Sequence, residues 1–215
     1  MPQPRKSDKR RYDAPARRAA AARTREAILR AAVRRFEADG WIATTVAAVA
    51  EAAGVSPKTV EATFGTKAAL LQASVDFAIR GDAAAAEMLE RPSVAEMERV
   101  AAAAEMLDLH ARHVRVVNER SSALALVVEH AASADARVWE LWEQMNRNRT
   151  TGVRWAARTY AAKSGASPAL DAADVETVFW VALDWATFRT VTSLAGRDAD
   201  GFEAWLRGYY RALLL

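Results

Sequence analysis

The chain of 215 residues is long enough for one large domain or two small ones with a buried core. Its composition, 52% hydrophobic and 27% charged with only 9 Gly and 6 Pro, is that of a globular protein built from helices. The absence of cysteine excludes disulfide scaffolds, thiolate metal sites and cysteine nucleophiles. Since no apolar stretch approaches the roughly 18 residues of a membrane span, and the N-terminus lacks the apolar core of a signal peptide, we expect a cytoplasmic protein with no membrane partner.

Positive charge is concentrated towards the N-terminus, within a net charge of +3. Residues 1–80 carry 15 Lys and Arg against 8 Asp and Glu, whereas residues 81–215 carry 15 against 19. Such an asymmetry suits contact with a polyanion at one end of the molecule. Residues 1–22 contain three prolines, seven basic residues and little that is apolar, so we expect a disordered basic arm. The arm can follow the phosphate backbone of DNA or enter its minor groove, or it can simply keep the chain soluble, and both roles are open.

A first helix is predicted from Thr24, because Ile28 and Phe36 recur on one face at helical spacing. It is expected to end at Gly40, a residue type typical of the position after a helix. The following Trp41 is then able to fold back on the last turn.

Two short helices and the start of a longer one follow. Thr45 is the predicted N-cap of the first short helix, which ends at a glycine. Ser56 and Pro57 supply the N-cap and first residue of the second, which runs through about Ala62. Thr66 caps the longer helix. A two-turn helix, a turn containing glycine and a second short helix form a helix-turn-helix.

The rest of the chain shows long helical patterns. We expect helices at about 67–90, 93–118, 121–132, 136–162, 171–195 and 199–213. The segment 171–195 is apolar around nearly its full circumference, which indicates burial on two sides. Asp184 in its middle needs a partner if buried, for which an arginine across a dimer is favoured over a polar group of a ligand. Trp205, Tyr209 and Tyr210 in the last helix suit either an interface or a core.

Residues 25–71 read REAILRAAVRRFEADGWIATTVAAVAEAAGVSPKTVEATFGTKAALL and resemble the N-terminal domain of TetR-family transcriptional regulators. The similarity lies in the Ile-Leu-x-Ala-Ala-x-x-x-Phe run, the Gly-Trp pair, Thr-Thr-Val, Val-Ala-x-x-Ala-Gly-Val-Ser, and Phe-x-x-Lys before Leu-Leu. The resemblance implies an all-α fold with a three-helix helix-turn-helix DNA-binding domain at 23–71. A larger helical ligand-binding and dimerisation domain would occupy 72–215. One departure is Val60-Glu61, where the family usually has a Leu-Tyr pair.

The recognition helix of a helix-turn-helix enters the major groove by its N-terminal residues. Lys58 can donate to guanine or to a phosphate, and Thr59 can touch a thymine methyl group or a base edge. Thr45 is placed to hold a phosphate together with backbone N–H groups. The candidate DNA-binding residues are Thr45, Ser56, Pro57, Lys58, Thr59, Glu61, Thr63, Phe64 and Lys67, of which Phe64 also belongs to the expected core of this domain.

Lys67 and Glu61 carry the charges whose roles matter most. A cation in the first turn of a helix is disfavoured by the helix dipole, a cost that a bound phosphate offsets. The family resemblance assigns the same phosphate contact to Lys67. Glu61 can accept a hydrogen bond from a cytosine amino group, or it can form a salt bridge with an arginine of the first helix.

For the second domain the resemblance implies a homodimer through about 171–213 and a pocket for a small-molecule effector. The candidate ligand-binding residues are Trp142, Met145, Trp155 and Trp180, although core packing explains each equally well. His110 and His113 are spaced i, i+3, but no third ligand has motif spacing, so polar lining of a pocket or a surface position is favoured over metal binding. We expect no metal and no cofactor.

The sequence therefore predicts a ligand-responsive regulator, in the leading hypothesis a repressor. It would bind a palindromic, inverted-repeat operator in double-stranded DNA as a dimer and be released by its effector. The alternatives are a non-specific architectural DNA binder and an activator of the same family. An enzyme is disfavoured, and no catalytic residues are assigned, because the chain has no nucleophile elbow, P-loop, dinucleotide-binding turn or His/carboxylate metal motif.

Overall fold

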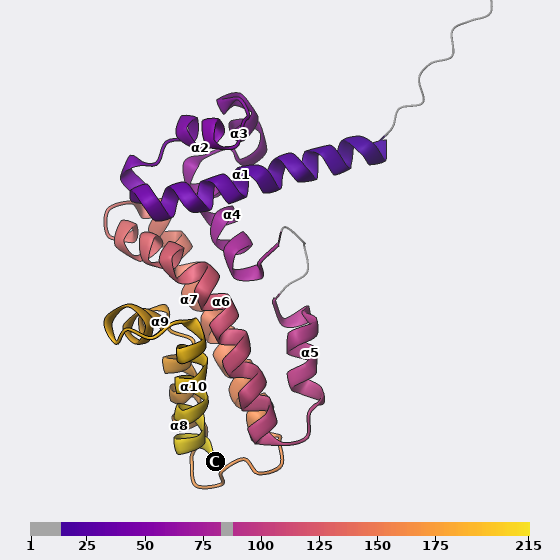
Figure 1. The fold of residues 1–215 in the computed structure, drawn as a ribbon, viewed down its shortest axis with the longest axis vertical. Helices are drawn as coiled ribbons and strands as arrows, with labels where there is room; N and C mark the ends of the chain where they lie inside the picture. The colour runs from indigo at the N-terminus through magenta and orange to yellow at the C-terminus, as the bar shows by residue number, and fades with distance from the viewer. Residues whose placement is uncertain (1–13, 83–87) are drawn as a thin grey trace, which may run out of the picture.

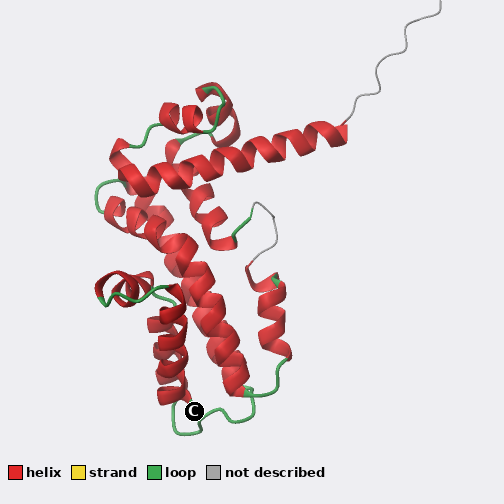
Figure 2. Cartoon of the chain, viewed as in Figure 1, coloured by secondary structure: helices red, strands yellow, loops and turns green. Residues whose placement is uncertain are grey.

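The computed structural model describes residues 14–82 and 88–215, and most of them lie in helices (Figures 1 and 2). The α-helices are α1 (Ala14–Ala43), α2 (Val46–Ala52), α3 (Pro57–Phe64), α4 (Lys67–Arg80), α5 (Pro92–Arg99), α6 (Ala103–Ala132), α7 (Ala136–Ala161), α8 (Ala172–Ala182), α9 (Trp185–Arg189) and α10 (Ala199–Leu214). A 3-10 turn, η1 (Met88–Glu90), precedes α5, and a π-helical turn, η2 (Thr190–Leu194), follows α9. None of the helices in the described ranges is long and apolar enough to cross a membrane.

The central element of the molecule is α6, which packs against α1, α4, α5, α7, α9 and α10. Figure 1 shows α1, α2 and α3 gathered at one end, with α4 leading from them towards the long pair α6 and α7. Helices α8 and α10 lie along one side of this pair and α5 along the other. The fold thus has a small N-terminal part at the end opposite the C-terminus and a larger helical part.

The three predicted N-caps of the N-terminal part are confirmed. The side chains of Thr45, Ser56 and Thr66 each accept a hydrogen bond from the backbone N–H three residues later, at 3.1, 3.2 and 3.1 Å respectively. Each capping residue has extended backbone angles, as an N-cap requires. These bonds set the starting points of α2, α3 and α4.

The predicted break at Gly40 is also confirmed. Gly40 has φ 73° and ψ −176°, which L-residues with a side chain rarely adopt, and the backbone leaves the helical conformation there within the span of α1. Trp41 then stacks on Phe36, with ring centroids 6.1 Å apart. The chain therefore turns back on α1 before α2 begins.

The start of α1 corrects the predicted disordered arm. Residues 14–22 are helical, because the run APARRAAAA is dominated by alanine and arginine, two strong helix formers. This helical extension has no apolar face to bury, which is why the sequence pattern did not reveal it. The remainder of the arm, residues 1–13, lies outside the described residues.

Several helix boundaries in the second half also differ from the prediction. The long helix expected at 67–90 ends at Arg80, where Gly81 adopts φ 81°. The segments expected at 93–118 and 121–132 form one continuous α6, and the break comes earlier, at 100–102. There the backbone pairs with Ser164, whose N–H donates to the Ala101 carbonyl at 3.0 Å. The helix expected at 171–195 is interrupted between α8 and α9.

Among the described residues, the core consists of two hydrophobic clusters. One lies within the C-terminal helices, around Phe179, Phe202 and Tyr210. The other contains the apolar faces of α1 to α4 together with residues from the adjoining ends of α6 and α7, such as Leu124 and Val138. The DNA-binding helices expected at 23–71 therefore share their core with the rest of the chain, and packing continues across that boundary through α4.

Candidate functional site

The helix-turn-helix lies at the end of the molecule opposite the C-terminus, with α2 and α3 on its outer side (Figure 1). Gly54, with φ 67°, turns the chain between them. The exposed members of the candidate DNA-binding set are Thr45, Ser56, Pro57, Lys58, Glu61 and Thr63, and the half-buried members are Thr59, Phe64 and Lys67. The structure therefore places the leading end of α3 at the surface.

Hydroxyl groups at the start of α3 are held by local hydrogen bonds. The side-chain oxygens of Ser56 and Thr59 lie 2.9 Å apart, and Thr63 donates its hydroxyl to the Thr59 carbonyl at 2.7 Å. The Thr45 oxygen accepts from a backbone N–H, which leaves its hydroxyl proton available to a phosphate. These contacts orient the predicted base-facing and phosphate-facing groups before any DNA is present.

Lys67 is held in place by the ring of Trp41, which is not among the predicted DNA-binding residues. Its ammonium lies 4.3 Å from the ring centroid of Trp41 and donates to the Ile42 carbonyl at 3.4 Å. Partial burial lowers the pKa of Lys67 from its ordinary value. Since Trp41 itself stacks on Phe36, Lys67 is a positioned cation, with its charge set between α1 and α4.

Glu61 has no ion-pair partner in the described ranges, so the salt bridge with an arginine of the first helix is not observed. The arginines of α1 make other contacts: Arg30 pairs with Glu26 at 2.7 Å, and the guanidinium of Arg25 lies 4.5 Å from the ring centroid of Phe64. Glu61 is exposed on α3. Two roles are predicted for Glu61, a salt bridge within the protein and a contact with a base. Its exposed carboxylate is compatible with the second.

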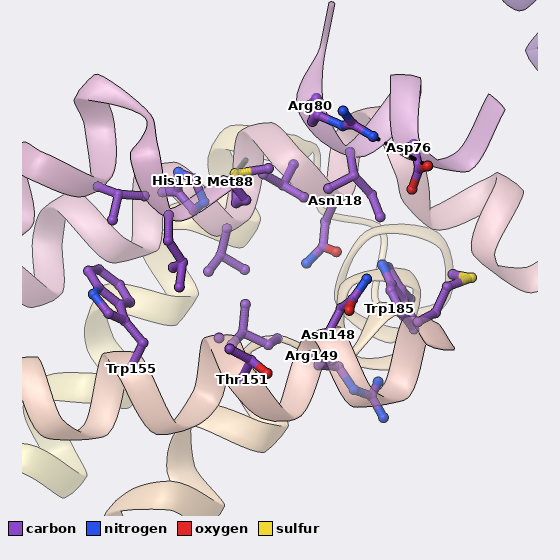
Figure 3. Close-up of a pocket in the computed structure, with 18 of the residues that line it drawn as sticks. Asp76, Arg80, Met88, His113, Asn118, Asn148, Arg149, Thr151, Trp155 and Trp185 are labelled. Carbon is purple, nitrogen blue, oxygen red and sulfur yellow. Dashed lines mark ion pairs between the residues drawn. The ribbon is translucent and has the colours of Figure 1, made fainter. Parts of the chain in front are cut away.

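A cavity of about 420 Å³ lies between α4, α6 and α7 (Figure 3). Its size is within the range of small-molecule sites. The apolar residues of its wall are Val75, Ile79, Met88, Leu89, Val94, Val114, Val117, Met145, Trp155, Leu183 and Trp185. The cavity is therefore a mainly apolar chamber to which α4 contributes one wall.

Two histidines of α6 line this cavity, which is one of the positions predicted for them. His110 is 2% exposed and its Nδ1 lies 2.7 Å from the Tyr210 hydroxyl. Burial, with a smaller effect from His113, lowers the pKa of His110 to about 3. Burial likewise lowers the pKa of His113, whose Nδ1 lies 3.3 Å from Ser93, to about 4. Both imidazoles are therefore neutral near pH 7.

The charged groups of the cavity wall are paired with opposite charges. Asp76 and Arg80 lie 3.3 Å apart on α4. Arg149 of α7 bonds to Asp184 at 2.8 Å. This pair corrects two expectations, since Asp184 precedes α9 instead of lying in mid-helix and its arginine belongs to the same chain. Because Arg149 already neutralises Asp184, no polar group of a ligand is needed to do so.

Of the four candidate ligand-binding residues, Met145 and Trp155 line the cavity and the other two do not. Trp142 packs against Trp185, with ring centroids 6.0 Å apart, and the guanidinium of the α7 arginine described above covers Trp180 at 4.6 Å. Helical spacing shows which face of a helix is apolar, but it does not show which neighbouring residue each side chain contacts. Trp185, which the prediction left out, forms part of the wall.

The comparisons with known proteins agree with this arrangement. Residues 28–74, from within α1 to within α4, match the family described as bacterial regulatory proteins, tetR family. The helix-turn-helix part of the chain is therefore similar to TetR-family regulators in sequence. No curated protein matches the sequence.

Solved structures of transcriptional regulators share the fold over most of this chain. A protein from Rhodococcus sp. assigned to the family has a TM-score of 0.67 and 18% identity, covering 90% of this chain and 99% of that one. NalD of Pseudomonas aeruginosa has a TM-score of 0.63 and 18% identity, covering 91% and 97%. A transcriptional regulator of Saccharomonospora viridis in complex with choline has a TM-score of 0.63 and 17% identity, covering 88% and 96%. At these identities the likeness establishes the fold alone.

Removing the Lys67 charge tests its expected phosphate contact. Lys67→Ala is expected to weaken binding to all duplex DNA by the same factor and to lower the slope of log affinity against log salt by roughly one. Fluorescence anisotropy over a salt series measures both quantities. Arg158→Ala, which removes an exposed charge from the far part of α7, is the control. A loss confined to one base position, or an unchanged slope, contradicts the phosphate contact.

The buried histidines predict a loss of stability in mild acid. The unfolded chain binds a proton at His110 below about pH 6.5, whereas the folded chain does so only near pH 3, so the contribution is complete above pH 6.5 and is lost as the pH falls. For His110 alone the free energy of unfolding drops by about 2 kcal/mol between pH 7 and pH 5. Urea unfolding of His110→Gln is expected to show a flatter pH dependence over this range. His130→Gln, at an exposed position, serves as control. If the free energy of unfolding depends on pH equally in the wild type and in both variants, the buried His110 is not the source of the acid sensitivity.

Proposed function

We propose that this protein is a DNA-binding transcriptional regulator of the TetR type, a repressor that binds an inverted-repeat operator as a dimer and releases it when a small molecule fills the cavity. The observation that carries this proposal is a shared set of side chains. Val75, Met145 and Trp185 line the cavity and also belong to the hydrophobic cluster that holds the DNA-binding helices. A ligand in the cavity therefore contacts the packing that sets the position of the helix-turn-helix.

Helix α4 supplies the mechanical connection. Its 14 residues extend about 21 Å, with Lys67 at the end near the DNA and Val75 and Ile79 at the cavity. Leu70 and Leu71 lie between these ends and are fully buried in the shared cluster. A ligand that displaces the cavity end of α4 thus changes the orientation of α3. A coupling free energy of about 1–3 kcal/mol corresponds to a change in DNA affinity of about 5- to 150-fold.

On DNA, the proposed roles follow the surface described above. The start of α3 enters the major groove, where Ser56, Pro57 and Lys58 lead and Thr59 and Glu61 follow on the next turn. Thr45 and Lys67 flank this end of the helix and hold phosphates. Two copies place two recognition helices in grooves about one helical turn, ~34 Å, apart or somewhat more.

The proposed dimer surface is the outer face of α8 and α10, within the predicted range 171–213. The large side chains of α10 are directed inward, since Tyr210 and Leu214 are fully buried and Trp205 and Tyr209 pack against the core. The outward residues are mostly small and follow each other at i, i+4, i+8; they are Ala173, Thr177 and Val181 on α8, and Ala204, Gly208 and Ala212 on α10. Small side chains allow two helix pairs to approach closely, and Val181 and Leu213 remain 38% and 45% exposed in the single chain.

The related structures support the two finer parts of the proposal. NalD is described as the secondary repressor of a multidrug efflux pump, and the Saccharomonospora viridis regulator is in complex with choline. One protein of similar fold is a repressor and another binds a small molecule. These likenesses support repression and ligand binding as proposals for this chain.

Selection of bound fragments from random-sequence DNA by the full chain tests the operator. Near physiological salt, the expected result is an enriched inverted repeat, because a two-fold dimer reads the same half-site twice. A reporter gene placed behind the selected sequence is expected to be silenced. Salt-sensitive binding without any enriched motif contradicts the proposal and favours an architectural DNA binder, whereas a rise in reporter output identifies an activator.

Filling the cavity with a side chain is expected to imitate the effector. Gly152 of α7 lines the cavity, and a Cβ added there meets nothing within 4 Å, so the side chain of Gly152→Trp can start towards the cavity without a clash at its Cβ. Operator affinity of the folded variant is expected to fall by about 5- to 150-fold in a mobility-shift titration. Arg154→Trp places the same ring on an exposed position of α7 and is expected to bind operator normally. Equal affinities for the two variants contradict the coupling between cavity and DNA.

A bulky charge on the outer face of α10 is expected to separate the dimer. At Gly208 an added Cβ meets nothing within 4 Å, so Gly208→Arg leaves the single chain folded while its guanidinium obstructs a partner. Sedimentation equilibrium is expected to show monomers and a loss of binding to the full operator. Ala95→Arg on the exposed side of α5 is the control. A Gly208→Arg dimer of unchanged stability places the interface elsewhere.

A further inference from the structure

One buried amide of the cavity wall has an unmet hydrogen bond. Asn118 of α6 is 3% exposed, and its Nδ2 has no hydrogen-bond partner among the described residues. Figure 3 shows the side chain extending from α6 into the space that faces α7. Because an unpaired buried donor destabilises a fold, a donor of this kind indicates that an acceptor binds there in another state of the molecule.

The surroundings of this donor are apolar. Val114, one helical turn before Asn118, and Val117 line the same cavity, as do Val75 and Ile79 from α4. A ligand body in contact with these side chains gains free energy by leaving water, and one polar group then fixes its orientation. The wall thus suits a mainly apolar molecule with a hydrogen-bond acceptor opposite Nδ2.

The wall offers no uncompensated charge within the described ranges. Arg80 is paired with Asp76 at 3.3 Å, and Arg149 with Asp184 at 2.8 Å, so an ionic ligand has to compete with an existing ion pair. Burial keeps both lining histidines neutral by lowering the pKa of His110 to about 3 and that of His113 to about 4. An ion entering this chamber would lose its hydration without gaining a free counter-charge.

We propose that the effector is an uncharged, mainly apolar molecule whose carbonyl-type oxygen accepts a hydrogen bond from Nδ2 of Asn118. This inference rests on the proposed function, since it names the ligand class of the regulatory cavity. A plain hydrocarbon fills the same space but leaves the donor unpaired. A carboxylate or an ammonium of the same shape carries a charge that the wall does not neutralise.

A matched set of four probes separates these classes. Butyrophenone, butylbenzene, 4-phenylbutanoate and 4-phenylbutylammonium share a phenyl ring and four further carbons, and differ in whether they carry a ketone, no polar group, an anion or a cation. Binding to the full chain is followed by intrinsic fluorescence, since Trp155 and Trp185 line the cavity. The ketone is expected to bind about tenfold more tightly than the hydrocarbon, and both ions more weakly than the ketone.

Two variants assign the preference to the amide. Asn118→Leu keeps the size of the side chain and removes the donor, so it is expected to weaken ketone binding about tenfold and to leave hydrocarbon binding unchanged. Ser121→Ala is the matched control, because this buried hydroxyl on the same helix already donates to the Val117 carbonyl at 2.8 Å. Circular dichroism verifies that both variants fold, and the ranking of the four probes on the wild-type chain decides the ligand class independently of either variant.

Tighter binding of either ion than of the ketone, no binding of any probe, or an Asn118→Leu chain that keeps its preference for the ketone would overturn the assignment. Operator binding is measured in parallel with each probe to keep the two proposals distinct. A ketone that binds through Asn118 without releasing operator leaves the ligand class intact and overturns release by a ligand. An ion that binds and releases operator leaves release by a ligand intact and overturns the ligand class.

Discussion

The position of the recognition helix depends on one continuous hydrophobic cluster. Leu71 and Val75 of α4 pack in the same cluster as Ile28 and Phe36 of α1, and Leu124 of α6 belongs to it as well. Protein interiors are packed to the density of organic crystals, so a displacement at one point of such a cluster is felt by its neighbours. The helix-turn-helix is therefore fixed relative to the larger domain by α4, and its orientation responds to what α4 contacts below.

The cavity adjoins this cluster, and its chemistry follows from the helices that enclose it. Because α6 is central, the residues on its cavity side are enclosed by α4, α5 and α7. His110 and Asn118 sit on that side, one bonded to the Tyr210 hydroxyl and the other with an unpaired Nδ2. Apolar walls, neutral imidazoles and paired charges together make a chamber that is suited to an uncharged ligand and costly for an ion.

Charge at the DNA-binding end is placed by aromatic rings. Trp41 lies between Phe36 and the ammonium of Lys67, and Phe64 at the end of α3 lies under the guanidinium of Arg25. Such contacts hold a cation at low entropic cost, because the flexible stem is already ordered before DNA binds. The small N-terminal part thus presents a pre-arranged surface, on which Glu61 of α3 is exposed without an ion-pair partner among the described residues.

Signals that act over three or four residues were readable from the sequence alone. The N-caps Thr45, Ser56 and Thr66 and the break at Gly40 are confirmed because a cap or a positive φ depends on its immediate neighbours. The same local signals carry the resemblance to the TetR family, which residues 28–74 match. That resemblance implies an all-helical fold, and the described residues show it. The helical start of α1 was missed because a polar helix without an apolar face has no periodic pattern.

Only the tertiary structure decided how the distant helices meet. The 3.6-residue period shows which face of a helix is apolar, but it does not say which helix covers that face. For this reason Met145 and Trp155 reach the cavity whereas Trp142 and Trp180 do not. The break before α6 likewise depends on backbone pairing with residue 164, and Asp184 finds its arginine 35 positions earlier in the chain. Contacts between residues so far apart arise from packing, and packing is decided by the whole chain at once.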